Sequence, residues 1–288
     1  AMSLTAFITI RSASSLDYDA IEAFLKKNLI VHSHLDWRQP LEWIGHSPCL
    51  MLEKDKKITG LLMCPAEIKD IYWIRLFAVP VGTSPEDAFR LLFAQALTEI
   101  HQMSSQPTIA SIAFQHWMKN LLVSSGWEKF QEVVQLRWRG QKAALENNHE
   151  RCNFSIRKMK AIDIPTITCI DHTCFESIWQ HSEDTIERSY EQAAYSTVAE
   201  KAGIVVGYQI STAMGTNAHI ARLAVLPEYQ RQGVGQSLIH DMLLHFKKPW
   251  IREITVNTQK DNYKSLGLYT KIGFEPTSDG FPIFRYRE

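Results

Sequence analysis

LAVLPEYQRQGVGQS, residues 223–237, is the stretch that says most about the fold of this chain of 288 residues. It starts as an apolar strand, turns through Gln230-x-x-Gly233-x-Gly235, and runs into a segment with apolar residues at helical spacing. The start of a helix carries unpaired N–H groups and the positive end of the helix dipole, and glycines let a backbone approach a ligand closely. We therefore predict a site for a pyrophosphate group where this strand meets this helix.

Two other phosphate-binding motifs fit this stretch poorly. A P-loop needs Gly-Lys-Ser/Thr after the glycines, and the chain has Gly235-Gln236-Ser237 instead. A dinucleotide-binding fingerprint needs a third small residue where Leu238 stands. A turn with a purely structural role remains the alternative interpretation at this stage.

The chain contains an internal repeat. Three segments recur at a constant offset: EKDKKITG (53–60) as EKAGIVVG (200–207), IRLFAVP (74–80) as ARLAVLP (221–227), and SGWE (125–128) as IGFE (272–275). We therefore expect two copies of one domain, a first half at 1–140 and a second half at 151–288, joined by the polar stretch GQKAALENNHER.

Each half is predicted to be α/β with a mixed sheet. In the second half, period-2 patterns predict strands, and apolar residues at helical spacing predict a long helix after Gly235 that Pro249 ends. Gly273 is expected to close the helix that follows the last of these strands. The predicted strands are FSIRKM (154–159), YSTVAEKAG (195–203), IVVGYQIS (204–211), HIARLAVL (219–226) and REITVNTQ (252–259).

Composition excludes several classes of function. Lys plus Arg and Asp plus Glu are 31 each, so no net field would attract nucleic acid or an anionic membrane. No apolar run approaches the length that spans a bilayer, and we expect a cytoplasmic protein. The five cysteines include no CxxC pair, which favours reduced thiols. Cys169-x-x-His172-x-Cys174 would be spread around a helix, so no metal is expected.

The order strand, LAVLPEYQRQGVGQSL, helix, strand and then N-x-x-S-x-x-x-Y-x-x-x-G-F (262–274) resembles the GNAT superfamily of acyl-CoA-dependent N-acetyltransferases. The motifs cover the second half, and the repeat extends the resemblance to the first. It implies two tandem GNAT-like domains, each with a mixed, splayed β-sheet flanked by helices. Two neighbouring parallel strands, HIARLAV and ITVNTQ, would separate so that the pantetheine arm of acetyl-CoA enters like a strand.

The resemblance also implies which residues bind acetyl-CoA, the expected co-substrate. The strand would pair with the pantetheine amides, the backbone after Gln230 would hold the pyrophosphate, and Asn262 would contact the cofactor arm. We call residues 230–237 the phosphate loop. The residues assigned to acetyl-CoA in this way are Leu223, Ala224, Val225, Gln230, Arg231, Gln232, Gly233, Val234, Gly235, Gln236, Ser237, Asn262 and Ser265.

The first half lacks the phosphate loop. Its corresponding sequence, VGTSPED (81–87), predicts an ordinary helix start with Ser84 as N-cap, Pro85 at the first position and Asp87 reaching back. Glu86 and Asp87 would repel a pyrophosphate at this position. We therefore expect a degenerate first domain without a CoA site, which packs as a structural half.

Acetyl transfer needs a base for the amine and a proton donor for the departing thiolate. By the resemblance, Tyr269 would face the sulfur as the acid, and His219, where many members of the superfamily carry a glutamate, could be the base. A tyrosine that only packs on the sheet and a histidine without a role at a strand edge are the alternatives.

The acceptor amine is less clearly indicated. A lysine amine costs roughly 4.6 kcal/mol to deprotonate at pH 7, against about 1 kcal/mol for an α-amine, so a single histidine favours an α-amine or a weakly basic small amine. Phe175 and Trp179 suggest an aromatic wall, and Asn257 and Gln259 could direct polar groups at the substrate. FESIWQHS (175–182) resembles N-terminal peptide acetyltransferases, but Asn257 replaces the glutamate of their strand motif.

The function predicted from sequence is therefore N-acetyl transfer from acetyl-CoA to a peptide N-terminus or a small-molecule amine by direct attack. The competing hypothesis is an acyl-CoA-binding pseudoenzyme or sensor that kept the phosphate loop and lost turnover. The intact Asn262, Tyr269 and two loop glycines favour the enzyme.

Overall fold

The computed structural model describes residues 7–140 and 154–287, and it divides the chain into two compact units. Unit 1 is Ala1–Phe130 with Pro282–Glu288, and unit 2 is Gln131–Phe281. Most of β9 (Glu128–Trp138) therefore belongs to unit 2, and the end of β15 (Glu275–Arg285) belongs to unit 1. The last strand of each sequence half thus completes a sheet in the other unit. The predicted linker lies outside the described residues except for Gly140.

Unit 2 contains six strands of a mixed sheet in the order β10-β11-β12-β13-β14-β9, and β15 follows β9 in the same sheet. Neighbours among these six strands pair antiparallel except β13 and β14, which are parallel. The α/β class and the strands expected in the second half are confirmed. The elements are β10 (Ser155–Lys158), α4 (Ile164–Cys174), α5 (Glu183–Gln192), β11 (Tyr195–Lys201), β12 (Ile204–Met214), β13 (Asn217–Val225), α6 (Val234–His245), β14 (Glu253–Gln259) and α7 (Tyr263–Ile272).

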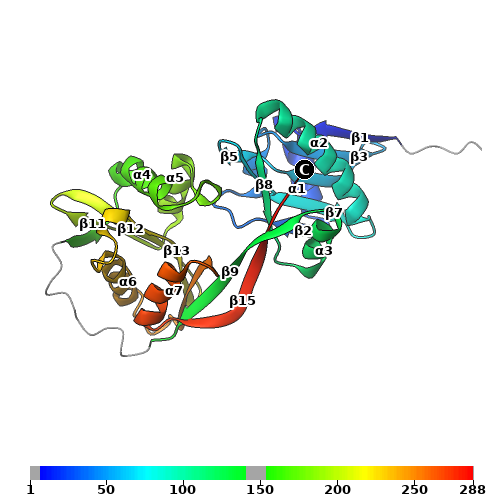
Figure 1. The fold of residues 1–288 in the computed structure, drawn as a ribbon. Helices are drawn as coiled ribbons and strands as arrows, with labels where there is room; N and C mark the ends of the chain where they lie inside the picture. The colour runs from blue at the N-terminus through cyan, green and yellow to red at the C-terminus, as the bar shows by residue number, and fades with distance from the viewer. Residues whose placement is uncertain (1–6, 141–153, 288) are drawn as a thin grey trace, which may run out of the picture. The chain divides into compact units, whose positions relative to one another are not determined.

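Helices cover both faces of this sheet, with α4 and α5 on one face and α6 and α7 on the other (Figure 1). Ala218 and Ile220 of β13 pack with the α6 and α7 side, while Ala224 packs with the α4 side. The change of face follows a β-bulge, because Ile210 pairs with Arg222 while Ser211 already pairs with Ile220. The bulge therefore re-aims the last residues of β13.

The same bulge marks the point where β13 and β14 separate. Their parallel pairing runs from Asn217 opposite Glu253 to Ile220 opposite Val256 and then stops. Both strands continue beyond it, to Val225 and Gln259. The splayed gap expected from the sequence is therefore present in unit 2.

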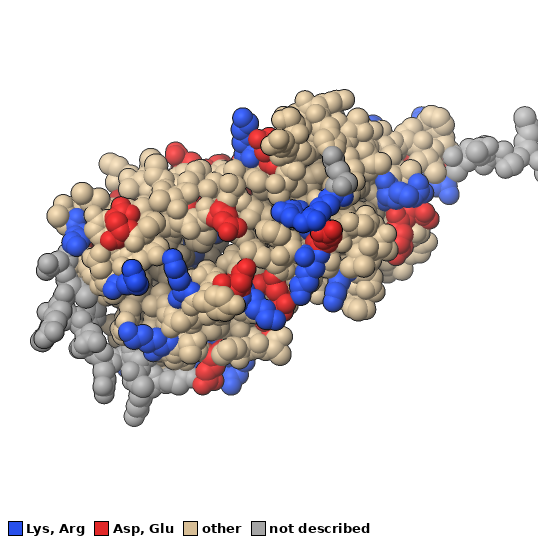
Figure 2. All heavy atoms as spheres, in the orientation of Figure 1, with Lys and Arg blue, Asp and Glu red and all other residues tan. Residues whose placement is uncertain are grey.

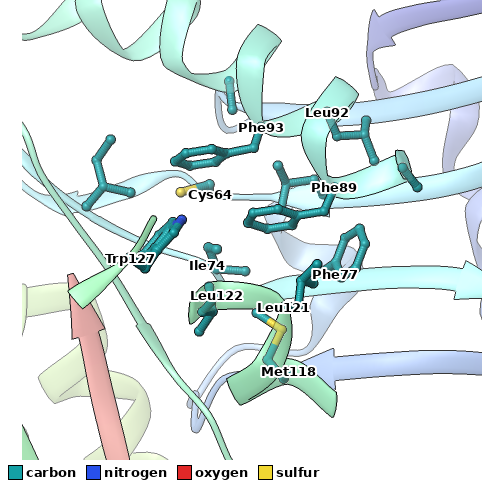
Figure 3. Packing of buried hydrophobic residues seen from close by; sticks show 14 of the residues in the cluster. Cys64, Ile74, Phe77, Phe89, Leu92, Phe93, Met118, Leu121, Leu122 and Trp127 are labelled. Atoms are coloured by element: carbon teal, nitrogen blue, oxygen red, sulfur yellow. The ribbon is translucent and has the colours of Figure 1, made fainter. Parts of the chain in front are cut away.

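Unit 1 repeats much of this plan around a larger aromatic core. Phe89, Phe93 and Trp127 pack against one another beneath α2, with ring centroids 5.2 to 6.4 Å apart (Figure 3). The elements are β1 (Ile8–Ser12), α1 (Tyr18–Leu25), β2 (Leu29–Ser33), β3 (Cys49–Lys54), β4 (Lys57–Met63), β5 (Ala66–Ile68), β6 (Ile71–Trp73), β7 (Leu76–Pro80), α2 (Pro85–Met103), β8 (Thr108–Ile112) and α3 (His116–Ser124).

Unit 1 differs from unit 2 at the position of the splayed gap. In the repeat, β6 and β7 correspond to the two parts of β13, and β6 pairs in parallel with β8 as β13 pairs with β14. The edge of β7, however, is covered by β2, which pairs antiparallel from Leu29 opposite Pro80 to Ser33 opposite Leu76. A strand of the chain itself thus occupies the edge that no described strand covers in unit 2.

Charges of both signs are interspersed on the face of the molecule drawn in Figure 2. In the part of the chain that the structure describes, no helix has the length and apolar character needed to cross a membrane. The cytoplasmic location stays a prediction.

Candidate active site

The open edge of β13 presents backbone groups to the gap. Antiparallel strands turn their N–H and C=O groups alternately toward and away from the partner. Leu226 donates its N–H to the carbonyl of Val206 on the β12 side, so in this register Leu223 and Val225 turn theirs toward the gap, away from β12. Ala224 turns its backbone toward β12, where its carbonyl would lie 2.8 Å from a Cβ added to Gly207. A ligand in the gap can therefore pair with Leu223 and Val225.

Part of this edge already has partners within the protein. The carbonyl of Val225 accepts hydrogen bonds from the Gln230 side chain at 2.9 Å and from the Cys174 thiol at 3.3 Å. Gln230, assigned above to acetyl-CoA, thus ties the phosphate loop to the end of β13. Among the predicted pairing residues, Leu223 and the N–H of Val225 are the groups that remain available to a ligand within residues 7–140 and 154–287.

The phosphate loop has the backbone conformation of an anion-binding turn. Arg231 and Gly233 both have positive φ, at 58° and 87°, and α6 begins at Val234. Left-handed residues alternating with right-handed ones direct successive N–H groups toward one concave point. Residues other than glycine rarely have a positive φ unless the surrounding structure imposes it, and Arg231 has one here.

Loop contacts leave the first turn of α6 accessible. In the described part of the chain, the backbone hydrogen bonds of the loop and of Tyr229 just before it use the N–H groups of Tyr229, Gln230 and Ser237. The amides that open a helix have no acceptor within it, so those of Val234 and Gly235 can meet an anion. The Gln232 side chain donates to the Glu228 carbonyl at 2.8 Å, which holds the turn itself.

These features fit the pyrophosphate and pantetheine of acetyl-CoA. The loop offers N–H groups at the positive end of a helix, and the adjoining strand offers the backbone groups of Leu223 and the N–H of Val225. A Cβ at Gly235 would lie 3.2 Å from Leu268 Cδ2, so the space above this helical turn is narrow. The assignment of individual residues to acetyl-CoA stays a proposal.

Asn262 and Ser265 lie at the start of α7. The Asn262 side-chain oxygen caps this helix by accepting from the Ser265 N–H at 3.1 Å. Its oxygen is therefore used locally, and the amide NH₂ is the group that could contact a cofactor arm. Gly273 closes the helix with φ 105°, as predicted.

Tyr269 lies on the buried face of α7 and is 5% exposed. Its ring packs near Phe274 with centroids 5.6 Å apart. Burial raises the pKa of the Tyr269 phenol above its ordinary value of 10. The hydroxyl is thus a poor proton source at neutral pH, but it can still donate a hydrogen bond to a thiolate.

His219 and Ala218 lie on opposite faces of β13. His219 comes one residue before Ile220, where the parallel pairing with β14 ends. Its Nδ1 lies 2.8 Å from the hydroxyl oxygen of Thr255, the residue opposite it on β14. Burial lowers the pKa of His219 below 6.5, so the ring is neutral at pH 7. When Nδ1 donates to Thr255, Nε2 carries a lone pair that can accept a proton.

Asn257 and Gln259 share the face of β14 with Thr255, because Ile254 and Val256 are buried on the other face. The two amides follow Val256, the last residue of β14 that pairs with β13, and therefore lie beside the gap. The predicted alternation is confirmed, while the contact of either amide with a substrate stays a prediction.

Comparison with known proteins decides the class of this site. The family profile described as an acetyltransferase (GNAT) domain matches residues 165–282, a range that includes the phosphate loop, His219 and Tyr269. The second half is a GNAT acetyltransferase domain. The chain is an acyltransferase of this type, and its relatives are N-acetyltransferases.

Several relatives match the GNAT domain in sequence, and two of them show the range. A Bacillus subtilis protein assigned as a ribosomal protein bS18-alanine N-acetyltransferase is 28% identical over 122 residues, which are 42% of this chain and 81% of that protein. An N-alpha-acetyltransferase of Sulfolobus acidocaldarius is 27% identical over 143 residues, which are 45% of this chain and 84% of that protein.

Among the solved structures that match the whole chain in fold is a tandem protein. A tandem GNAT protein from the clavulanic acid biosynthesis pathway superposes with a TM-score of 0.58 at 13% identity and covers 98% of both chains. The likeness supports the fold of two tandem GNAT-like domains that the repeat predicted.

The first GNAT-like domain starts α2 as expected in most respects. Ser84 caps the helix by accepting from the Asp87 N–H at 3.2 Å, and Pro85 is the first residue. The prediction that the Asp87 side chain reaches back is wrong, because its carboxylate lies 3.4 Å from Arg90 one turn later. The side chains of Asp87 and Arg90 are both exposed. An ion pair along the helix therefore competes with the cap for the Asp87 carboxylate.

Sequence reasoning missed a buried ion pair beside the gap in the GNAT domain. Asp171 of α4 accepts from Arg222 Nε at 2.7 Å and from the Tyr208 hydroxyl at 2.6 Å. Burial by itself would raise the pKa of Asp171, but the charge of Arg222 and these hydrogen bonds hold it below its usual range. The repeat offered one signal, since Arg75 occupies the same position in the first half and is also buried and paired.

The ion pair supports the expected aromatic wall. The Arg222 guanidinium lies over the Phe175 ring at 3.6 Å, and it donates to the Trp179 carbonyl. Phe175 directly follows α4, and Trp179 ends a short 3₁₀-helix, Ser177–Trp179. Both aromatic residues are thereby fixed on the face of the sheet that carries His219.

Proposed function

We propose that this GNAT domain transfers an acetyl group from acetyl-CoA to the α-amine of a peptide or small molecule. The observation that carries the proposal is the open edge of β13 leading directly into the phosphate loop. Acetyl-CoA supplies a thioester whose acetyl group is transferred. Leu223 and Val225 would align its pantetheine arm, and the amides at the start of α6 would neutralise its pyrophosphate.

The protein side chains then serve the proton steps. A neutral amine attacks the thioester carbonyl, a C–N bond forms, and the C–S bond breaks. His219 Nε2, directly or through water, would take the proton from the amine, and the Tyr269 hydroxyl would stabilise the departing sulfur. Because burial keeps His219 neutral at pH 7, it is ready to accept that proton.

The α-amine is favoured over lysine for two reasons. The lowered pKa of His219 makes it a weak base, which suits an amine of pKa about 7.8 better than one of about 10.4. The two sequence relatives carry names that specify an alanine and an N-alpha amine as their acceptors. Asn257 stands where N-terminal peptide acetyltransferases carry a glutamate, so the assay includes both peptides and small amines as acceptors.

The test is thiol release from acetyl-CoA with a panel of matched amines. A short peptide with a free N-terminal alanine is compared with the same peptide acetylated at its N-terminus and carrying one lysine, and with small primary amines. We expect release with free α-amines and little with the lysine peptide. CoA binding by calorimetry without turnover on any amine would instead favour the acyl-CoA sensor.

A further inference from the structure

Trp179 forms hydrogen bonds to residues of two strands. Its backbone carbonyl accepts from Arg222 on β13, and its indole Nε1 donates to Gln131 Oε1 on β9 at 2.9 Å. In the sheet, β14 lies between those two strands. Trp179 therefore reaches across β14, on the face that carries α4.

The point of crossing coincides with the splayed gap. Arg222 comes two residues after Ile220, the last residue of β13 that pairs with β14, and Gln131 lies just beyond Val133, the partner of Gln259 at the end of β14. Trp179 thus passes over the part of β14 that is no longer joined to β13. This is where the thioester end of a ligand lying along β13 would come within reach of an amine.

Gln131 comes from the first half of the sequence repeat. Its strand, β9, corresponds to β15, which ends the second half, yet residues 131–138 of β9 pair with β14 in unit 2. On β9, Leu136 and Trp138 are buried on the α7 side, so alternation places Gln131 and Gln135 on the opposite face. Gln135 stands directly opposite Asn257.

We propose, building on the function above, that Gln131 is a positioning residue that holds Trp179 over the gap as a fixed wall of the acceptor site. The first sequence half is then part of that site, although it has no phosphate loop of its own. An indole presents an apolar plate, so the wall contacts the apolar part of the acceptor beside its amine. Arg222 holds the same wall from the cofactor strand, and Gln131 holds it from the far side.

The experiment compares four variants of the full chain with the wild type: Gln131→Leu, Gln131→Glu, Trp179→Phe and the double variant Gln131→Leu/Trp179→Phe. Leucine removes the acceptor oxygen, glutamate keeps one, and phenylalanine removes the indole N–H. The matched control is Glu132→Gln, because Glu132 is the neighbouring residue on the same strand and pairs with Lys260 at 3.5 Å. Steady-state KM is measured separately for the amine and for acetyl-CoA.

We expect Gln131→Leu to raise the KM of the amine about five-fold, the effect of one hydrogen bond, with the KM of acetyl-CoA unchanged. Gln131→Glu restores the wild-type value, and the double variant matches Trp179→Phe alone. An unchanged amine KM in Gln131→Leu, an equal rise in both KM values, or additive effects in the double variant overturns the proposal.

A second readout separates this inference from the proposed function. If the wild type transfers acetyl to no amine, the proposed function fails, but the contact can still be followed by the indole N–H resonance that disappears in Trp179→Phe. That resonance should move upfield in Gln131→Leu and stay in place in Glu132→Gln. No movement in Gln131→Leu refutes the positioning role.

Discussion

Gly235 offers the most direct test of the phosphate loop. It stands in the first turn of α6 with an ordinary helical φ, so other residues can adopt its backbone conformation. An added Cβ would lie 3.2 Å from Leu268 Cδ2 and 3.8 Å from Val225 Cγ2, and the first of these atoms ends a flexible side chain. Substitution should therefore leave a folded protein, since replacing helical glycine gains about 1 kcal/mol that offsets the contact.

The effect on CoA affinity is expected to be large and to depend on charge. A carboxylate about 5 Å from a phosphate charge, at an effective dielectric constant of about 20, costs about 3 kcal/mol. That repulsion raises Kd by roughly two orders of magnitude for each phosphate charge at that distance. The series Gly235→Ala, Gly235→Gln and Gly235→Glu adds in turn a Cβ, the bulk of a side chain and a negative charge.

Calorimetric titration with CoA measures Kd for each member of the series, and thermal unfolding without ligand checks the fold. We expect Gly235→Glu to bind at least about 10²-fold more weakly than Gly235→Gln, with the difference shrinking at high salt. The three variants should melt within a few degrees of the wild type. If Gly235→Glu binds CoA as tightly as Gly235→Gln, the pyrophosphate does not lie at this helix start and the argument fails.

Four further predictions follow from the same geometry. Tyr269→Phe keeps the packing area, so CoA Kd should stay constant while kcat falls by about 10² to 10³, the usual effect of losing one hydrogen-bond donor to a developing negative charge; a lower affinity with unchanged kcat would make Tyr269 a packing residue only. Because burial lowers the pKa of His219, activity should be present above that pKa and lost as pH falls through it, with the acidic limb of kcat/KM lying below about pH 6.5; the role is refuted by a limb that persists in His219→Ala. Calorimetry should return one CoA per chain, since β2 covers the corresponding edge in unit 1, and a stoichiometry of two would contradict this. Asp171→Ala leaves Arg222 buried without its partner and should reduce the free energy of unfolding by about 3 to 5 kcal/mol in urea denaturation; a loss below about 1 kcal/mol would show that the pair is dispensable.

Local patterns in the sequence were sufficient for most of the secondary structure of the second half and for the turn of the phosphate loop, although α6 ends at His245 and not at Pro249 as predicted. The positive φ at Gly233, the glycine end of α7 and the Ser84 cap each depend on residues within one turn of each other. The alternation of Thr255 and Asn257 with buried neighbours needs only the two-residue period of a strand. Such features depend on residues that are close together in the sequence, so a single sequence is enough to predict them.

The choice of neighbouring strands was decided only by the tertiary structure. The last strands of the two halves, with LRWR (136–139) and FRYR (284–287), carry similar patterns, and either could complete either sheet. Backbone N–H and C=O groups at a strand edge can pair with any strand of suitable pattern. No short stretch of the sequence therefore indicates that β9 pairs with β14 and β15 with β8. For the same reason, nothing in Leu29–Ser33 indicates that it covers β7.

The acceptor wall also depends on contacts distant in sequence. Asp171 and Arg222 are 51 residues apart, and Trp179 and Gln131 are 48 apart. A buried charge must find a partner, but which partner is set by how the helices pack on the sheet. The sequence by itself therefore determined the class of fold and the loop proposed to bind the cofactor, whereas the folded sheet decided which half supplies each wall of the proposed acceptor site, because strand pairing and burial act between residues that the chain keeps far apart.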